Sequence, residues 1–254
     1  MSGPATARPS EQVIQALIDR HRTLYESAEI DSALEGLIRD VPFVKLSSWD
    51  IHRILRGSRS VFFDTHVEVV SGHHTATYLR FESIARTSQF ITVIARDMAD
   101  WVFRTFHETG LVGIVTTRSD AYVLAERMVD LLYDRMRLRL VATPFHTETG
   151  KIGTDISAGA IRTGERFLSF NDVTTRGMCV SKLGKVITDH GGILSGMMVF
   201  ARRDSGQFPL MDELAMQYPF YFCADLKMPQ WEPGECPLCR KHVPLLSWRD
   251  MPEL

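Results

Sequence analysis

The fold of this chain is decided by FLSFNDVTTRGMCVSKLGKVITDHGG, residues 167–192. The stretch begins as a short apolar strand and continues into a hydroxyl-rich loop that contains one glycine. Apolar side chains then recur at helical spacing, at Val180, Leu183, Val186 and Ile187. Gly191 and Gly192 close the predicted helix. A loop placed between a strand and a helix presents backbone N–H groups at the helix N-terminus, so the stretch predicts a phosphate-binding loop.

The same order of elements occurs earlier in the chain. An apolar run at residues 111–115 is followed by TTRSD, by a helical pattern and by the strand-like run 138–142, while a further apolar run at 193–201 follows the stretch quoted above. Tandem strand–helix–strand units predict an α/β fold with a mostly parallel sheet covered on both faces. The loops at 116–120 and 171–179 would then lie on one rim of the sheet, which suits a ligand with phosphates at both ends.

The flanking segments show their own patterns. Residues 1–10 are small and polar and are predicted to form a frayed tail. Two helical patterns follow, at residues 11–25 and 33–38, and residues 66–81 alternate as a hairpin does. An amphipathic helix is predicted at residues 90–102.

Composition excludes several classes of protein. A formal net charge of −2 and a pI near 6.5 leave no basic surface for nucleic acid or an anionic membrane. The sequence lacks an apolar run long enough to span a membrane, and its first residues do not form a secretory signal. Four unevenly spaced cysteines do not form a disulfide framework. We therefore expect a cytoplasmic protein.

Three segments resemble one known family. HVEVVSGHHTATY (66–78), GERFLSFNDVTTRGMC (164–179) and WEPGECPLCRKHVPL (231–245) are similar, in this order, to motifs of the long bacterial type of orotate phosphoribosyltransferase. The resemblance runs from about Val61 to Trp248. It implies a type I phosphoribosyltransferase-like fold with a small hood. The implied division is an N-terminal tail and helical extension (1–60), a phosphoribosyltransferase-like α/β domain (61–230) and a C-terminal CxxC tail (231–254).

The resemblance also implies a function in nucleotide metabolism. Members of the family are glycosyltransferases that move ribose 5-phosphate from phosphoribosyl pyrophosphate onto a nitrogen of orotate, with Mg²⁺, and they are usually homodimers. An active chain would therefore bind phosphoribosyl pyrophosphate or a nucleotide and would need Mg²⁺. The N-terminal helices, which lie outside the resemblance, are a candidate contact for a protein partner.

The resemblance assigns the site residues one by one. Asp172 would hold the ribose hydroxyls, and Lys151 would come from a mobile loop; these two form the catalytic prediction. The predicted substrate-binding residues are Asn171, Thr174, Thr175, Arg176, Gly177 and Cys179 at the sugar phosphate, with Arg118 and Ser119 at the pyrophosphate. The predicted site contains no metal ligand.

This sequence departs from the family pattern at the predicted site. Asn171 stands where the family has the first of two adjacent acids, and Met178 and Cys179 replace small or hydroxyl residues. The segment 116–120 lacks the glycines of the family's pyrophosphate loop, and Asp120 is interpreted as a helix N-cap. An alternative function is therefore a catalytically degenerate fold that senses a nucleotide or serves as a subunit of an assembly.

Several of these residues also have a purely structural interpretation. Asp172 could cap its loop, and Arg118 and Arg176 could be solvated surface arginines. Cys179 is either a thiolate stabilised by a helix N-terminus or a simple buried cysteine. His73 and His74 are predicted to be structural or exposed.

The CxxC pair leaves a further alternative open. Cys236 and Cys239, with His242 three residues later and Cys223 thirteen residues before, supply four soft ligands. A tetrahedral zinc site that docks on a partner is chemically possible, although isolated CxxC pairs are common.

Overall fold

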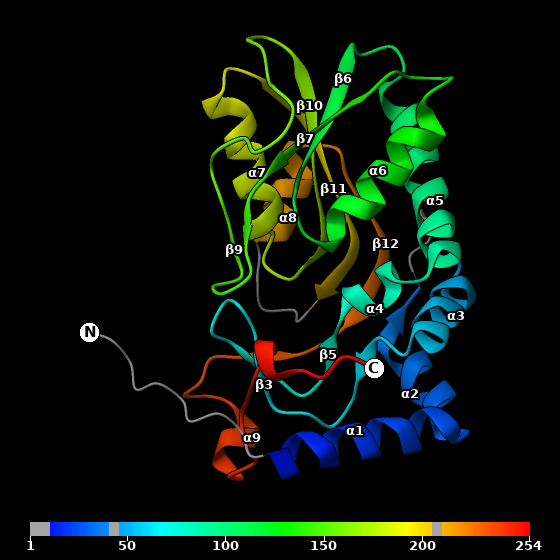
Figure 1. Ribbon diagram of the computed structural model, residues 1–254, viewed down its shortest axis with the longest axis vertical. Coiled ribbons are helices and arrows are strands. Elements are labelled where there is room, and N and C mark those ends of the chain that lie inside the picture. Colours follow the sequence, from blue (N-terminus) through cyan, green and yellow to red (C-terminus); the bar gives the residue numbers. More distant parts are fainter. Residues whose placement is uncertain (1–10, 41–45, 205–209) are drawn as a thin grey trace.

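The structure is a computed structural model that describes residues 11–40, 46–204 and 210–254 of the chain. The predicted frayed tail, residues 1–10, lies outside the described residues. Figure 1 shows a large α/β part above a smaller part built from short strands, with a long helix beneath them. The N-terminal helices of the described chain are α1 (Glu11–Glu26), α2 (Glu29–Leu37) and α3 (Ser48–Ser58).

The main sheet has six strands in the order β1-β12-β11-β10-β6-β7. They are β1 (Ile38–Arg39), β6 (Leu111–Thr117), β7 (Arg139–Thr143), β10 (Arg166–Thr174), β11 (Ile193–Asp204) and β12 (Phe220–Lys227). The neighbours from β12 to β7 are parallel, and β1 pairs antiparallel with β12 at the edge. The predicted mostly parallel sheet is confirmed. The edge strand β1 comes from the segment expected to be helical.

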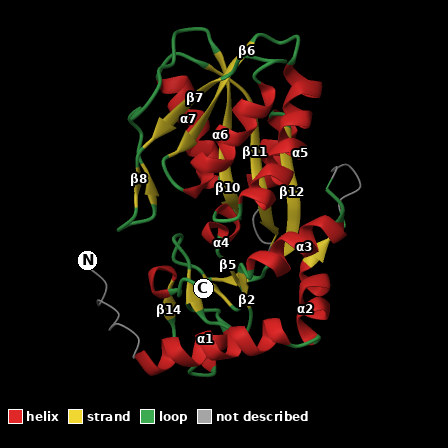
Figure 2. Ribbon diagram, turned by 45° about the vertical axis from the view of Figure 1, so that its right-hand side comes forward, coloured by secondary structure: helices red, strands yellow, loops and turns green. Residues whose placement is uncertain are grey.

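Helices cover both faces of this sheet (Figure 2). On one face lie α4 (Phe81–Ala85), α5 (Ser88–Phe106) and α6 (Asp120–Leu132), and on the other α7 (Met178–Asp189) and α8 (Leu210–Gln217). The helices expected from apolar periodicity are confirmed, with boundaries that extend a few residues beyond the patterns. In the part of the chain that the structure describes, no helix combines the length and the apolar character needed to cross a membrane.

The smaller part is a hood that faces the carboxyl ends of the main strands (Figures 1 and 2). It contains a four-stranded sheet, β13-β4-β3-β14, and the pair β2–β5. The strands are β2 (Val61–Phe62), β3 (Val67–Glu68), β4 (His74–Thr75), β5 (Tyr78–Leu79), β13 (Gln230–Trp231) and β14 (Leu246–Ser247). The predicted hairpin is confirmed as β3–β4. The C-terminal segment supplies both outer strands, so it completes the hood sheet.

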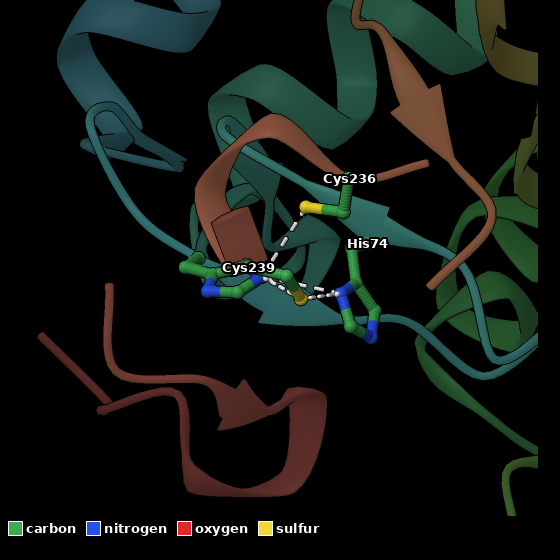
Figure 3. A group of neighbouring side chains, drawn as sticks. His74, Cys236 and Cys239 are labelled. Atoms are coloured by element: carbon green, nitrogen blue, oxygen red, sulfur yellow. Dashed lines mark hydrogen bonds between the residues drawn. The ribbon is translucent and has the colours of Figure 1, made fainter. Parts of the chain in front are cut away.

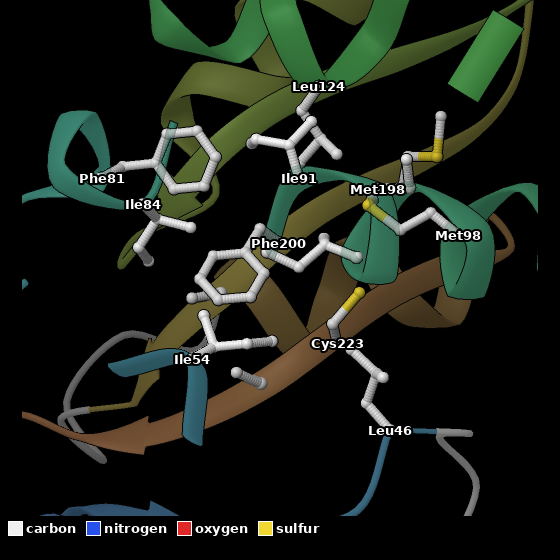
Figure 4. Packing of buried hydrophobic residues seen from close by; sticks show 14 of the residues in the cluster. Leu46, Ile54, Phe81, Ile84, Ile91, Met98, Leu124, Met198, Phe200 and Cys223 are labelled. Carbon is white, nitrogen blue, oxygen red and sulfur yellow. The ribbon is translucent and has the colours of Figure 1, made fainter. Parts of the chain in front are cut away.

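Three shorter elements complete the chain. They are the hairpin of β8 (Phe145–His146) and β9 (Lys151–Ile152), the short helix α9 (Pro237–Arg240), and the 3₁₀ turn η1 (Trp248–Asp250). The largest group of buried apolar side chains lies between the sheet and α4–α6 and reaches α2 and α3. Figure 4 shows its centre, where the ring of Phe200 lies among side chains from several helices.

One glycine marks a close approach inside the sheet. Gly113 lies in β6 between Phe167 of β10 and Arg139 of β7. A Cβ atom at Gly113 would overlap the carbonyl oxygen of Arg139 and would lie 2.7 Å from the Phe167 ring. Because a backbone oxygen in a paired strand cannot move aside, a side chain is not accommodated here.

We expect Gly113→Ala to lower the free energy of unfolding by about 1–3 kcal/mol, because it overpacks the sheet. Gly36→Ala is the matched control: Gly36 lies in α2 with open space around its Cα, so alanine should raise the same quantity by about 0.5–1 kcal/mol. Urea unfolding of both variants measures the two changes. Equal effects of the two substitutions would contradict the close approach.

Candidate functional site

The two predicted loops do lie on one rim of the sheet. β6 and β10 are parallel neighbours, so their carboxyl ends meet at the edge that faces the hood. The hydroxyl of Thr117, at the end of β6, donates to Asn171 Oδ1 in β10 over 3.5 Å. The rim is therefore a single connected structure.

Strand β10 extends further than its apolar run indicated. It continues through Thr174, so Asn171 and Asp172 belong to the strand and the loop shrinks to Thr175–Gly177. Asn171 is only 7% exposed, and its side-chain amide also donates to the Val173 carbonyl over 3.4 Å. The amide that replaces the family's first acid thus joins the two strands.

Asp172 is the half-buried carboxylate at this rim. Burial raises its pKa to about 6, and the nearby carboxylate of Asp120 raises it further. Hydrogen bonding to the Val173 backbone and the positive charge of Arg203 act in the opposite direction. At neutral pH Asp172 is therefore mainly ionised, but in a site that disfavours its charge.

The second loop is short and internally bonded. The backbone N–H of Gly177 donates to the Thr174 hydroxyl over 3.0 Å, and Gly177 itself has the left-handed φ of 74° that glycine favours. Gly177 provides no side-chain cap to α7, so the first turn of that helix keeps N–H groups for an anion. The Thr175 hydroxyl accepts a hydrogen bond of 3.2 Å from Gln230 Nε2 of the hood. Arg176 is half-buried beside these residues.

Cys179 lies in the first turn of α7 and is half-buried. Burial raises the pKa of its thiol to about 11, and the charge of Asp172 contributes in the same direction. The raised pKa favours a structural role for Cys179 over a thiolate stabilised by the helix N-terminus. Met178, which precedes it, is 47% exposed.

The first loop is organised by a serine. Ser119 is the N-cap of α6: its Oγ accepts from the Ala121 N–H over 3.3 Å and lies 2.7 Å from the Thr117 hydroxyl. The prediction that Asp120 caps this helix is wrong, because Asp120 is the first helical residue. Its carboxyl group instead has a raised pKa, from burial and from the neighbouring charge of Glu82. Arg118 is exposed.

Lys151 lies on a separate hairpin. It is exposed in β9, and the β8–β9 hairpin is held to the C-terminal segment by a 2.7 Å hydrogen bond from Arg249 Nε to the Glu148 carbonyl. The segment expected to be a mobile basic loop thus contacts the hood side of the molecule.

Three neighbours of Asp172 were not predicted as site residues. They are Asp120 at the start of α6, Arg203 near the end of β11, and Tyr78 in β5 of the hood. Burial raises the pKa of Tyr78. The negative charge of Asp172 also raises this pKa, and the positive charge of Arg203 lowers it. Tyr78 carried a signal in the sequence as the last residue of the 66–78 motif, and Asp120 as the last residue of the loop 116–120. Arg203 carried none, and its position follows from the pairing of β11 with β10.

The other histidines and cysteines named from the sequence lie outside the rim. His73 and His74 are 3% and 4% exposed, so they are structural rather than exposed. Cys223 is 1% exposed in the core, where burial and the Asp97 carboxylate raise the pKa of its thiol. His242 is exposed. Neither Cys223 nor His242 joins the CxxC pair.

Comparison with known proteins relates the whole chain to one family of enzymes. The chain is 34% identical to the orotate phosphoribosyltransferase of Thermus thermophilus over 102 residues, which is 40% of this chain and 52% of that relative, so it spans about half of the relative's length. It is 23% identical to that of Caldicellulosiruptor saccharolyticus over 182 residues, or 72% of this chain and 86% of the relative. The chain is a distant homologue of the orotate phosphoribosyltransferases.

The fold agrees with this relationship. The crystal structure of orotate phosphoribosyltransferase from Aeropyrum pernix superposes with a TM-score of 0.50 at 16% identity, over 69% of this chain and 93% of that one. No protein-family model matches the chain. The type I phosphoribosyltransferase-like fold is thus confirmed for this orotate phosphoribosyltransferase homologue.

Proposed function

We propose that the rim binds phosphoribosyl pyrophosphate or a nucleotide, with the sugar 5-phosphate at the loop Thr174–Gly177. The observation that carries this proposal is the environment of Asp172. Burial raises the pKa of this carboxyl group, and the group lies beside a helix N-terminus that has no side-chain cap. Carboxylates with a raised pKa cluster at functional sites, where a ligand or a reaction uses the charge. The homology at low identity supports the same ligand class.

Each predicted residue then has a definite role. Asp172 accepts hydrogen bonds from the ribose hydroxyls, and the N–H groups at the start of α7 bind the phosphate. Arg176 contributes positive charge to the phosphate, and Arg118 and Ser119 face the pyrophosphate from the neighbouring loop. Asn171 positions the rim through Thr117. Lys151 approaches from the β8–β9 hairpin, and Cys179 packs under the loop.

The residues fit the magnesium ion that this family typically uses. Asp172 and Asp120 lie close enough for the charge of Asp120 to raise the pKa of Asp172, and paired carboxylate oxygens are the donors that Mg²⁺ prefers. Bound Mg²⁺ would neutralise pyrophosphate charge. The chain's own contribution is to orient the ribose through Asp172 and to shield it beneath the hood.

If the protein is active, it is a glycosyltransferase that makes or breaks the bond between ribose C1 and a base nitrogen, with pyrophosphate as the other partner. The sugar ring becomes cationic in the transition state, and Asp172 is the carboxylate of β10 available to stabilise it.

The alternative, a catalytically degenerate nucleotide sensor or assembly subunit, is favoured by one observation. The buried neutral Asn171 supplies no charge to that cation.

Isothermal titration with phosphoribosyl pyrophosphate and Mg²⁺ tests the proposal. We expect micromolar binding by the unaltered protein and at least tenfold weaker binding by Asp172→Asn, since a charge-assisted contact is worth about 1.5–3 kcal/mol. Asp134→Asn is the matched control and should bind normally, because Asp134 is exposed in the turn between α6 and the amino end of β7, opposite the rim. Absence of binding by the unaltered protein would refute the proposal.

Pyrophosphate release then separates the two functions. Release on addition of orotate or another base indicates the transferase, whereas binding without release for any base indicates the sensor. We further propose a homodimer and a cytoplasmic location, as in the family, with the N-terminal helices as the contact for a protein partner. Mass measurement in solution tests the dimer.

A further inference from the structure

A group of four soft metal ligands assembles in the hood, away from the rim. It consists of His66, His74, Cys236 and Cys239, whose ligand atoms all lie within 4.8 Å of one another. We call it the Cys₂His₂ group. His66 immediately precedes β3 and His74 is the first residue of β4, while Cys236 is the N-cap of α9 and Cys239 lies within that helix. Figure 3 shows the labelled side chains pointing toward a common centre.

The separations match the edges of a zinc tetrahedron. With Zn–S bonds of about 2.3 Å and Zn–N bonds of about 2.0–2.1 Å, N···S edges are about 3.5 Å and the N···N edge about 3.3 Å. His66 Nε2 lies 3.4 Å from Cys236 Sγ and 3.6 Å from Cys239 Sγ. His74 Nδ1 lies 3.2 Å from Cys239 Sγ and 3.1 Å from His66 Nε2.

Hydrogen bonds among the side chains alone do not account for this arrangement. His66 Nδ1 lies 2.8 Å from the Val243 carbonyl, which can only accept, so Nδ1 carries the proton and Nε2 is left with one lone pair. Three polar atoms surround that single lone pair. One lone pair cannot accept from all three, whereas a cation at the centre accepts electron density from all four ligands.

The surroundings favour a closed metal site. His66, His74 and Cys236 are 2%, 4% and 0% exposed, and Cys239 is half-buried. Two thiolates balance the charge of one Zn²⁺ ion, so the occupied site is neutral and can be buried at low cost. The hydrogen bond from His66 to a backbone carbonyl is the outer contact that fixes a zinc-binding histidine.

We propose that the Cys₂His₂ group binds one zinc ion in a structural site. Two sulfur and two nitrogen ligands in a tetrahedron select zinc among the common divalent ions, and four protein ligands leave no position for a substrate. The ligand set differs from the one considered from sequence spacing, in which Cys223 and His242 would have joined the cysteines.

The zinc ion would fasten the C-terminal segment to the hood hairpin. β13 and β14 pair with β4 and β3 over only two residues each, and the metal ion would add a cross-link between the same segments. Gln230, in β13, is hydrogen-bonded to Thr175 of the rim loop. The metal would therefore hold in place the strand that contacts the predicted phosphate loop, but the zinc site itself does not depend on the proposed function.

Metal analysis of the full-length protein, purified without a metal-affinity column, tests this site. We expect about one zinc per chain, and zinc affinity lowered more than hundredfold in Cys239→Ser, because loss of outer-shell contacts alone costs about 10- to 100-fold. His242→Ala is the matched control and should keep its zinc. Normal zinc affinity in a folded Cys239→Ser, or loss of zinc in His242→Ala, would overturn the ligand set.

Cobalt replacement covers the case in which Cys239→Ser fails to fold. The metal-free unaltered protein, given one equivalent of Co²⁺, should develop thiolate-to-cobalt charge-transfer absorption and the intense visible bands of tetrahedral cobalt. Absence of both zinc and these bands in the folded unaltered protein would overturn the proposal.

Discussion

Asp172→Asn is expected to make the protein more stable at neutral pH, by about 1–3 kcal/mol. Burial raises the pKa of Asp172 from 3.8 to about 6, so the ionised form is less favourable in the folded protein than in the unfolded chain. A difference of about two pKa units corresponds to about 3 kcal/mol, and partial solvent access at this half-buried site reduces it. Urea unfolding at pH 7 measures the gain.

The pH dependence of this gain is a sharper test. The pKa of this carboxyl group is higher in the folded protein than in the unfolded chain. Its contribution to stability is therefore fully present below the pKa of the unfolded chain and is lost as the pH rises through the pKa of the folded protein. The advantage of Asp172→Asn over the unaltered protein should therefore be full above about pH 6 and vanish near pH 4. Destabilisation by Asp172→Asn at pH 7 would instead mean that Arg203 pairs favourably with Asp172.

The same variant is expected to bind phosphoribosyl pyrophosphate more weakly. The two results together would show that the ionised Asp172 lowers the stability of the unaltered protein and strengthens its ligand binding. A charge that weakens the fold and strengthens ligand binding is the usual compromise at functional positions. A substitution that affected stability and binding in the same direction would indicate a structural carboxylate.

Phe200→Ala is expected to lower the free energy of unfolding by about 3–5 kcal/mol. The ring is fully buried in β11, its centroid lies 5.5 Å from that of Phe81, and it packs at the centre of the largest core (Figure 4). Alanine would lose the transfer free energy of the ring and leave a cavity among helices that cannot all close around it. Urea unfolding of the purified variant measures the loss.

Met216→Ala serves as the control for this substitution. Met216 is 80% exposed in α8, so removal of its side chain should change the free energy of unfolding by no more than about 0.5 kcal/mol. A loss below about 1 kcal/mol for Phe200→Ala would contradict the packing of the core.

Local sequence patterns were sufficient for the elements of the main sheet. The runs at 111–115, 138–142, 167–170 and 193–201 all became strands, since buried parallel strands consist of short continuous apolar runs. Helices α5, α6 and α7 followed from apolar spacing. Strand ends were harder to predict: β10 continues through Asn171–Thr174, because pairing with β11 stabilises polar residues that have no apolar signal of their own.

The candidate site could be predicted only in part. Asp172 and the loop before α7 followed from the motif, because strand, loop and helix are adjacent in the sequence. The charges that shift the pKa of Asp172 could not be found in its own segment, since Asp120 comes from α6 and Arg203 from β11. Electrostatic effects of this kind depend on distances in space, which local patterns do not contain.

The sequence by itself determined the α/β class, the alternation of the main parallel strands with helices, the hairpin of the hood and the position of the loop that we propose to bind phosphate. Each of these depends on residues that are near one another in the chain. Only the tertiary structure decided which ligands join the CxxC pair. His66 and His74 lie more than 150 residues before Cys236 and Cys239, and the hood sheet, by pairing β13 and β14 with the hairpin, brings them together.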